Sequence, residues 1–111
     1  MKSVGVIGGG SWGTALVSLL SNNNSKTIWC VRSEQTINNI IEDKRNKKYL
    51  PNCTINTSQI KLTSSVADTI SECDILVVAT PAEYLLTTFS PINAKNLEGK
   101  FIISATKSLC N

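Results

Sequence analysis

Val-Gly-Val-Ile-Gly-Gly-Gly-Ser-Trp-Gly, residues 4–13, is the stretch that decides the fold, because an apolar strand there runs directly into a Gly-x-Gly-x-x-Gly loop. A helical pattern follows over residues 12–20. Its expected buried face consists of Ala15, Leu16, Leu19 and Leu20. In such a strand–loop–helix unit, backbone N–H groups and the positive end of the helix suit the pyrophosphate of a dinucleotide.

The three spaced glycines of this loop have separate expected roles. Gly8 permits the tight exit from the strand, Gly10 lets phosphate oxygens approach the backbone, and Gly13 lets the helix pack against the sheet. A glycine-rich turn with only a packing role is the alternative. The complete strand–loop–helix–strand unit favours dinucleotide binding.

Strands and helices alternate along the rest of the chain. Further strands are expected at residues 26–31, 60–62, 75–79 and 101–105, and helices at 33–43, at 65–71 and from Thr80-Pro81-Ala82 onward. Ser33 is the expected N-cap of its helix, whose buried face is expected to hold Ile37, Ile40 and Ile41. The alternation predicts an α/β fold with an open parallel sheet of the Rossmann type, in the order 3-2-1-4-5.

Composition bounds the possible functions. The 111 residues support one domain, residues 1–111, and the net charge of +3 is mild. The basic run Lys44–Lys48 is typical of a solvated loop, so we expect no nucleic-acid partner. No apolar stretch is long enough to span a bilayer, and the N-terminus lacks the pattern of a signal peptide.

The cysteines and the absence of histidine exclude further classes of site. Cys30, Cys53, Cys73 and Cys110 form no Cys-x-x-Cys pair, and the chain contains no histidine. We therefore expect no metal site and no Ser-His or Cys-His catalysis. Reduced cysteines in a cytoplasmic protein are the simple interpretation.

Candidate ligand contacts follow from the rule that ligands bind beyond the carboxyl ends of parallel strands. Ser11 offers a hydroxyl and a backbone N–H, and Trp12 either covers a cofactor or packs in the core. Arg32 follows the second strand, where an acidic residue usually holds the ribose of NAD. A guanidinium there suits the 2′-phosphate of NADP, so the sequence favours NADP or dual use, although a solvated arginine is the alternative.

Lys107 ends the fifth strand and faces the same crevice in the expected fold. An ammonium at this point suits a substrate phosphate or the polarisation of a carbonyl. A surface lysine at a strand end is an equal alternative from the spacing alone.

Several motifs together resemble a known family. They occur in order and cover almost the whole chain: Gly-Gly-Gly-Ser-Trp-Gly-Thr-Ala-Leu (8–16), Trp-Cys-Val-Arg (29–32), Lys-Tyr-Leu-Pro-Asn (48–52), Val-Val-Ala-Thr-Pro-Ala (77–82) and Ala-Thr-Lys (105–107). The set resembles the N-terminal domain of bacterial NAD(P)-dependent glycerol-3-phosphate dehydrogenase. Gly9, where alanine is usual, and Ser108, where glycine is common, are modest departures.

The resemblance implies a function and adds a site residue. It implies NAD(P)H-dependent reduction of dihydroxyacetone phosphate to sn-glycerol 3-phosphate for phospholipid synthesis. The residues matching Ser11, Trp12, Arg32 and Tyr49 contact the cofactor in that family. The residue matching Lys107 contacts both cofactor and substrate.

The resemblance also implies what this chain lacks. Family members continue into a helical C-terminal domain that carries the catalytic lysine and most of the substrate pocket. We therefore expect a Rossmann domain truncated before that domain, with no catalytic residue of its own. The chain alone is expected to bind cofactor weakly without turnover, and to meet dihydroxyacetone phosphate or glycerol 3-phosphate only when a C-terminal domain is present.

Two other interpretations remain open. One is a stand-alone NAD(P)-binding or regulatory module without catalysis. The other is a different reductase with a similar first domain, such as a ketopantoate or pyrroline-carboxylate reductase, against which the Ser-Trp-Gly-Thr-Ala-Leu segment argues. The truncation implied by the resemblance would also leave residues 101–105 as an exposed apolar edge strand, which a further strand covers in the full fold, so we expect low solubility or self-association through that edge.

Overall fold

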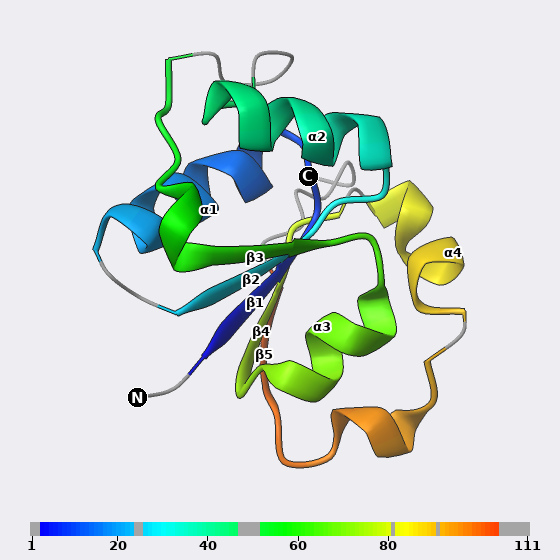
Figure 1. Ribbon diagram of the computed structural model, residues 1–111. Coiled ribbons are helices and arrows are strands. Elements are labelled where there is room, and N and C mark those ends of the chain that lie inside the picture. The colour runs from blue at the N-terminus through cyan, green and yellow to red at the C-terminus, as the bar shows by residue number, and fades with distance from the viewer. Residues whose placement is uncertain (1–2, 24–25, 47–51, 81, 91, 105–111) are drawn as a thin grey trace, which may run out of the picture.

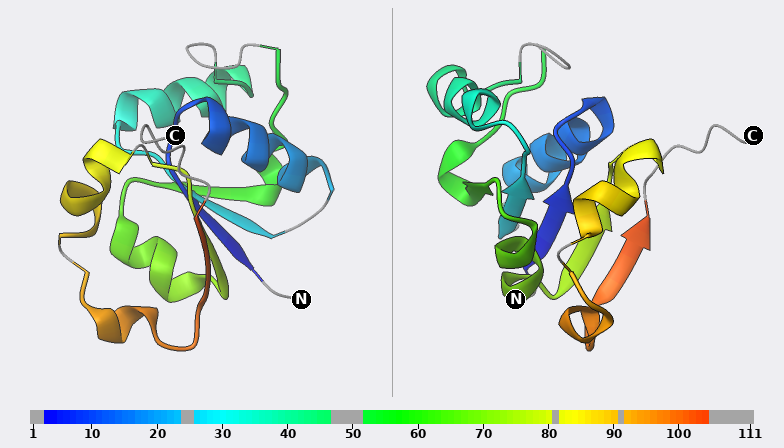
Figure 2. Two further views of the ribbon diagram at one scale, coloured as in Figure 1. Left: turned by 180° about the vertical axis from the view of Figure 1, so that it is seen from behind. Right: turned by 90° about the vertical axis from the view of Figure 1, so that its right-hand side faces the viewer.

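The computed structural model describes residues 3–23, 26–46, 52–80, 82–90 and 92–104. Five parallel strands form one sheet in the order β3-β2-β1-β4-β5, as the alternation of elements predicted (Figures 1 and 2). The strands are β1 Val4–Ile7, β2 Thr27–Cys30, β3 Ile60–Thr63, β4 Ile75–Val78 and β5 Phe101–Ser104. The α-helices are α1 Ser11–Asn22, α2 Glu34–Asp43, α3 Val66–Glu72 and α4 Leu85–Phe89, with shorter 3₁₀ turns η1 Thr57–Gln59, η2 Ala82–Tyr84 and η3 Ala94–Leu97.

Helices cover both faces of the sheet. Figure 1 shows α1 and α2 on one side and α3 on the other. The side of α1 and α2 holds one apolar core, formed by Val6, Val17, Trp29, Val31, Ile40, Ile55 and Val77. The side of α3 holds a second core, formed by Ile7, Ile28, Cys30, Ile70, Cys73, Leu76 and Val78. Burial on both faces explains why β2 and β4 read as continuous apolar runs.

The helix starts follow their sequence signals. Ser33 and Ser65 cap α2 and α3, because each hydroxyl accepts a hydrogen bond from the backbone N–H three residues later. Both prediction and structure place the start of α2 directly after Ser33. These caps fix the loops that follow β2 and β3.

The expected buried face of α1 is partly wrong. Leu19 is 62% exposed, and the buried positions are Gly13, Thr14, Val17 and Ser21, flanked by the partly buried Leu16 and Leu20. Small polar residues are buried here because the helix itself binds their hydroxyls: Thr14 donates to the carbonyl of Gly10 and Ser21 to that of Ser18. On α2 the expectation fails at Ile41, which is 53% exposed.

Strand β5 forms an exposed edge, as predicted, over the part that the structure describes. It pairs with β4 alone among the described strands, and Figure 2 shows no strand beyond it. Phe101, Ile102 and Ile103 are 71%, 47% and 46% exposed. The expected end of the strand at Ala105 lies outside the described residues.

Candidate functional site

The candidate site lies where the order of strands reverses. Strand β1 lies between β2 and β4. From β1 the chain continues to β2 on one side, and from β4 it continues to β5 on the other side of the sheet. A cavity of about 310 Å³ opens at that point. Its walls include the glycine loop, the stretch Cys30–Ser33 after β2, Thr80 after β4, and the side chains of Tyr84 and Thr88. This is the crevice in which open α/β sheets bind their ligands.

Each carbonyl of the three consecutive glycines accepts a hydrogen bond from inside the protein. The indole Nε1 of Trp29 donates to Gly8 O at 2.8 Å, and the amide Nδ2 of Asn46 donates to Gly9 O at 2.8 Å. Gly10 O accepts from the hydroxyl of Thr14 at 2.7 Å and from its backbone N–H at 3.0 Å. The polar backbone of the loop is therefore held in one orientation.

That orientation turns N–H groups outward. In a trans peptide unit the C=O and the following N–H point in opposite directions, and the described peptide bonds are all trans. With the three glycine carbonyls bound on the inside, the N–H groups of Gly9, Gly10 and Ser11 face away from them. The loop is thus arranged as a set of donors, which suits an anion.

The N-terminus of α1 is open in the same way. Among the described residues no side chain caps it, and its first turn carries no acidic residue. Helices α2 and α3, in contrast, have serine caps and carry Glu34 and Asp68 in their first turns. The free donors and the positive end of α1 therefore lack an internal anion and favour an external one.

The structure confirms the steric roles that the spacing predicted for Gly8 and Gly13. Gly8 has a φ of +133°, and a β-carbon there would lie 2.7 Å from the carbonyl oxygen of Ala79. A β-carbon on Gly13 would lie 2.1 Å from the carbonyl oxygen of Gly8, so only glycine permits this approach of α1 to the loop. A β-carbon on Gly10 would meet no atom of the residues that the structure describes within 4 Å. Its open side leaves the expected contact with phosphate as a prediction.

Arg32 and Tyr84 meet across the crevice. Arg32 is exposed directly after β2, and its guanidinium carbon lies 5.6 Å from the centre of the Tyr84 ring. A cation–π contact at this distance orients the guanidinium without removing its hydrogen-bond donors. Tyr84 was not among the predicted site residues, although the sequence Thr80-Pro81-Ala82 predicts that the chain begins a helix directly beyond the end of β4.

The structure decides between the core and the surface position of Trp12, whereas two other predicted site residues lie outside its described part. Trp12 is 58% exposed beside the loop, so its interpretation as a core residue is wrong, and Trp29 fills the core instead. Ser11 is exposed at the first position of α1. Tyr49 and Lys107, which were expected to contact cofactor or substrate, lie outside the described residues.

Cys30 lines the cavity with a neutral thiol. Burial raises the pKa of Cys30 above its ordinary value of 9.0, and a hydrogen bond with Thr69 opposes that rise only in part. A buried thiol of this kind is unreactive. Within the described ranges no three His, Cys, Asp or Glu side chains gather to hold a metal ion, and none of the helices there is long and apolar enough to cross a membrane.

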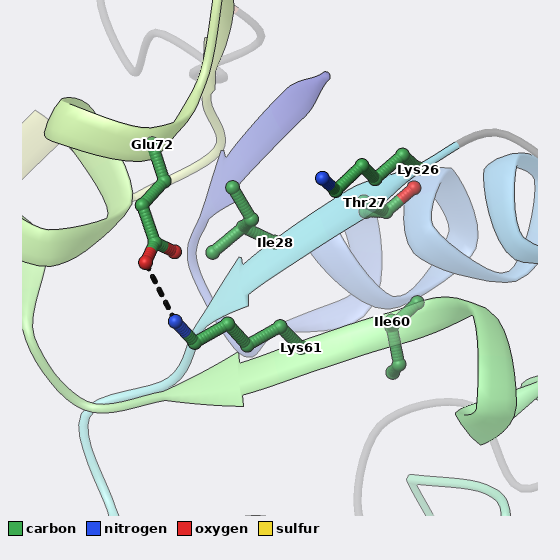
Figure 3. Close-up of a pocket in the computed structure, with 6 residues that line it drawn as sticks. All are labelled: Lys26, Thr27, Ile28, Ile60, Lys61 and Glu72. Atoms are coloured by element: carbon green, nitrogen blue, oxygen red, sulfur yellow. Dashed lines mark hydrogen bonds and ion pairs between the residues drawn. The ribbon is translucent and has the colours of Figure 1, made fainter.

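A second hollow, of about 400 Å³, lies at the opposite end of the sheet (Figure 3). It is lined at the starts of β2 and β3 by Lys26, Thr27, Ile28, Ile60 and Lys61, and by Glu72 at the end of α3. Lys61 Nζ lies 2.6 Å from Glu72 Oε1, and this hydrogen bond raises the pKa of Lys61. The ion pair joins the β3 edge to α3 and neutralises the charge of Lys61.

Comparison with known proteins identifies close relatives of the chain. Residues 3–111 match a family model described as the N-terminus of NAD-dependent glycerol-3-phosphate dehydrogenase. The chain is 42% identical over 84 residues to a glycerol-3-phosphate dehydrogenase [NAD(P)+] of Bacillus subtilis, covering 75% of this chain and 24% of that protein. It is 32% identical to the protein of the same name in Brachyspira hyodysenteriae, covering 98% of this chain and 32% of that protein.

A solved structure agrees with the fold. The glycerol-3-phosphate dehydrogenase of Saccharomyces cerevisiae superposes with a TM-score of 0.82 over 96% of this chain and 34% of that one, at 23% identity. The chain thus spans between a quarter and a third of the length of these relatives.

Proposed function

Because the chain belongs to the family of N-terminal domains of NAD-dependent glycerol-3-phosphate dehydrogenase, we propose that it forms the cofactor-binding part of such an enzyme. The reaction proposed is the NAD(P)H-dependent reduction of dihydroxyacetone phosphate to sn-glycerol 3-phosphate, for phospholipid synthesis. The main support for the proposal is the glycine loop, whose three carbonyls accept hydrogen bonds from inside the protein, so that the N–H groups of Gly9, Gly10 and Ser11 are turned away from those partners. An anionic pyrophosphate fits this donor set and the uncapped end of α1.

Different residues of the site are proposed to contact different parts of the cofactor. The N–H groups of Gly9, Gly10 and Ser11 hold the pyrophosphate, with Gly8 and Gly13 shaping the loop. Trp12, exposed beside the loop, covers the bound dinucleotide. Tyr49 and Lys107 are proposed to contact the cofactor, and Lys107 also the substrate. The nicotinamide, when bound, supplies the hydride for the reaction.

Arg32 supports a preference for NADP, or the use of both cofactors. An exposed guanidinium after β2, beside the ring of Tyr84, suits pairing with a 2′-phosphate, whereas a carboxylate at this position would repel it. The described cysteines Cys30, Cys53 and Cys73 are free thiols, which supports a reducing compartment, and we propose the cytoplasm.

The chain alone is proposed to be inactive. Hydride transfer requires the substrate carbonyl to be held against the nicotinamide with a proton donor in reach, and the described residues that line the crevice include no Lys, His, Asp or Glu. A stand-alone NAD(P)-binding module is the second candidate, since the same loop serves it equally well.

A chimera distinguishes the two candidates. The chain replaces the matching N-terminal segment of the Bacillus subtilis relative, and NADPH oxidation is followed with dihydroxyacetone phosphate. We expect turnover by the chimera and none by the chain alone. An inactive but folded chimera that binds NADPH would favour the stand-alone module, and turnover by the chain alone would contradict its proposed inactivity.

A further inference from the structure

Asn46 is buried directly behind the glycine loop. It lies three residues after the end of α2 and is only 3% exposed. Its Nδ2 donates to the carbonyl of Gly9 at 2.8 Å and to the hydroxyl of Thr14 at 3.0 Å. That hydroxyl in turn donates to the carbonyl of Gly10 at 2.7 Å. One side chain thus binds the carbonyl of Gly9 directly and supports the carbonyl of Gly10 through the Thr14 hydroxyl, beside the bond that the Thr14 backbone N–H donates to the same carbonyl.

The direction of these bonds determines what the loop presents to a ligand. The carbonyl of Gly9 shares a peptide plane with the N–H of Gly10, and the carbonyl of Gly10 shares one with the N–H of Ser11. Holding the two carbonyls inward therefore holds these two N–H groups outward. A buried amide is unfavourable unless it is hydrogen-bonded, so the side chain has little freedom to leave this position.

We propose that Asn46 is a positioning residue for the dinucleotide: acting through Gly9 and Thr14, it pre-orients the Gly10 and Ser11 N–H groups toward the pyrophosphate. The inference rests on the proposed function of the glycine loop. Asn46 itself lies behind the loop and acts on the ligand only through those two N–H groups. Preorganisation of this kind strengthens binding, because the loop is already ordered before the ligand arrives and its ordering entropy does not reduce the binding free energy.

The test uses two variants in the relay and one matched control. Asn46→Ala removes both donated bonds, and Thr14→Val removes the relay hydroxyl. Asn22→Ala is the control, since the amide of Asn22 also donates to the backbone, at the carbonyls of Ser18 and Thr54, and to the Ser18 hydroxyl, but at the far end of α1. Each protein is titrated with ADP-ribose, which contains the pyrophosphate, and with adenosine 2′-monophosphate, which lacks it.

We expect Asn46→Ala and Thr14→Val each to weaken ADP-ribose binding about tenfold and to change binding of adenosine 2′-monophosphate less than about twofold. The double variant should lose less than the product of the two single losses, because both act on one relay. Asn22→Ala should change neither affinity. Amide ¹⁵N relaxation of the ligand-free proteins should show increased motion at Gly10 and Ser11 in Asn46→Ala but not in Asn22→Ala.

Two results would overturn the inference. One is a lower unfolding temperature of Asn46→Ala with unchanged ADP-ribose affinity of the folded protein, and Thr14→Val provides the same comparison if Asn46→Ala does not fold. The other is unchanged relaxation at Gly10 and Ser11. Failure of the wild-type chain to bind ADP-ribose or NADPH would instead contradict the proposed function, and the relaxation data would still decide whether Asn46 orients the loop.

Discussion

A β-carbon on Gly13 would lie 2.1 Å from the carbonyl oxygen of Gly8, whereas a β-carbon on Gly10 would meet no atom of the described residues within 4 Å. Two glycines of one motif thus serve different purposes. Gly13 permits the close approach of α1 to the loop. Gly10 lines the crevice, and we expect a ligand phosphate to occupy the space beside it.

Substitution of Gly13 by alanine is therefore expected to destabilise the ligand-free protein. The added methyl group forces α1 away from the loop, and overpacking of this kind costs about 1–3 kcal/mol, more than alanine gains in helix propensity. Urea unfolding of the wild type and Gly13→Ala measures the difference. A change in unfolding free energy below about 0.5 kcal/mol would show that the loop gives way without cost.

Replacement of Arg32 is expected to change cofactor selectivity. Arg32→Gln removes the charge that pairs with a 2′-phosphate, so NADPH affinity should fall about tenfold or more while NADH affinity changes little. Tyr84→Leu should reduce NADPH affinity by a smaller factor, since the guanidinium loses the ring that orients it. Lys26→Gln, which removes an exposed charge at the opposite end of the sheet, is the control. Equal losses for NADPH and NADH in Arg32→Gln would argue against a 2′-phosphate site.

Stability is expected to fall at alkaline pH because of two buried thiols. Burial raises the pKa of both Cys30 and Cys73 above the ordinary value of 9.0. The two neutral thiols stabilise the folded state fully at pH values below this ordinary pKa. Above it the unfolded thiols ionise while the folded ones keep their protons, so the free energy of unfolding decreases as pH rises toward the folded pKa values.

The measurement is urea unfolding across this pH range for the wild type and Cys30→Ala. The variant should show a shallower decrease, since one of the two raised thiols is gone. Parallel curves for the two proteins would mean that Cys30 ionises equally in the folded and unfolded states.

The β5 edge is expected to mediate association of two copies. Its apolar side chains are about half exposed or more, and the strand has an unpaired edge in the described sheet. Sedimentation velocity should show a concentration-dependent dimer that Ile103→Lys weakens. Leu19→Lys, at a similarly exposed apolar position on α1, should leave the association unchanged. A wild-type monomer at all concentrations, or equal effects of the two substitutions, would exclude this edge.

Much of the fold was predictable because its signals are local. The apolar runs at β1, β2 and β4 predict strands by themselves. Ser33 predicts the start of α2, because its hydroxyl is a common N-cap group. The sheet order then follows from the handedness of parallel connections, which leaves few topologies. The packing roles of Gly8 and Gly13 follow from their position between strand and helix.

Other parts of the site were hidden because tertiary contacts create them. Asn46 belongs to a polar loop in the sequence, and only the fold brings its amide to Gly9 and Thr14. Trp29 reads as an apolar strand residue, yet its indole N–H also binds the carbonyl of Gly8. The error over the buried face of α1 has a different, local cause, since Thr14 is polar by type but its hydroxyl binds the carbonyl of Gly10 one turn earlier.

Titration of the wild type and of Gly10→Ala with NADPH tests whether the glycine loop binds the pyrophosphate of a dinucleotide. Gly10 has a φ of −82° and an open side among the described residues, so alanine there should leave the unfolding temperature nearly unchanged. We expect saturable binding by the wild type and binding at least about tenfold weaker by Gly10→Ala, because the methyl group occupies the space of a phosphate oxygen. Absence of wild-type binding, or equal affinities of the two proteins, would contradict it.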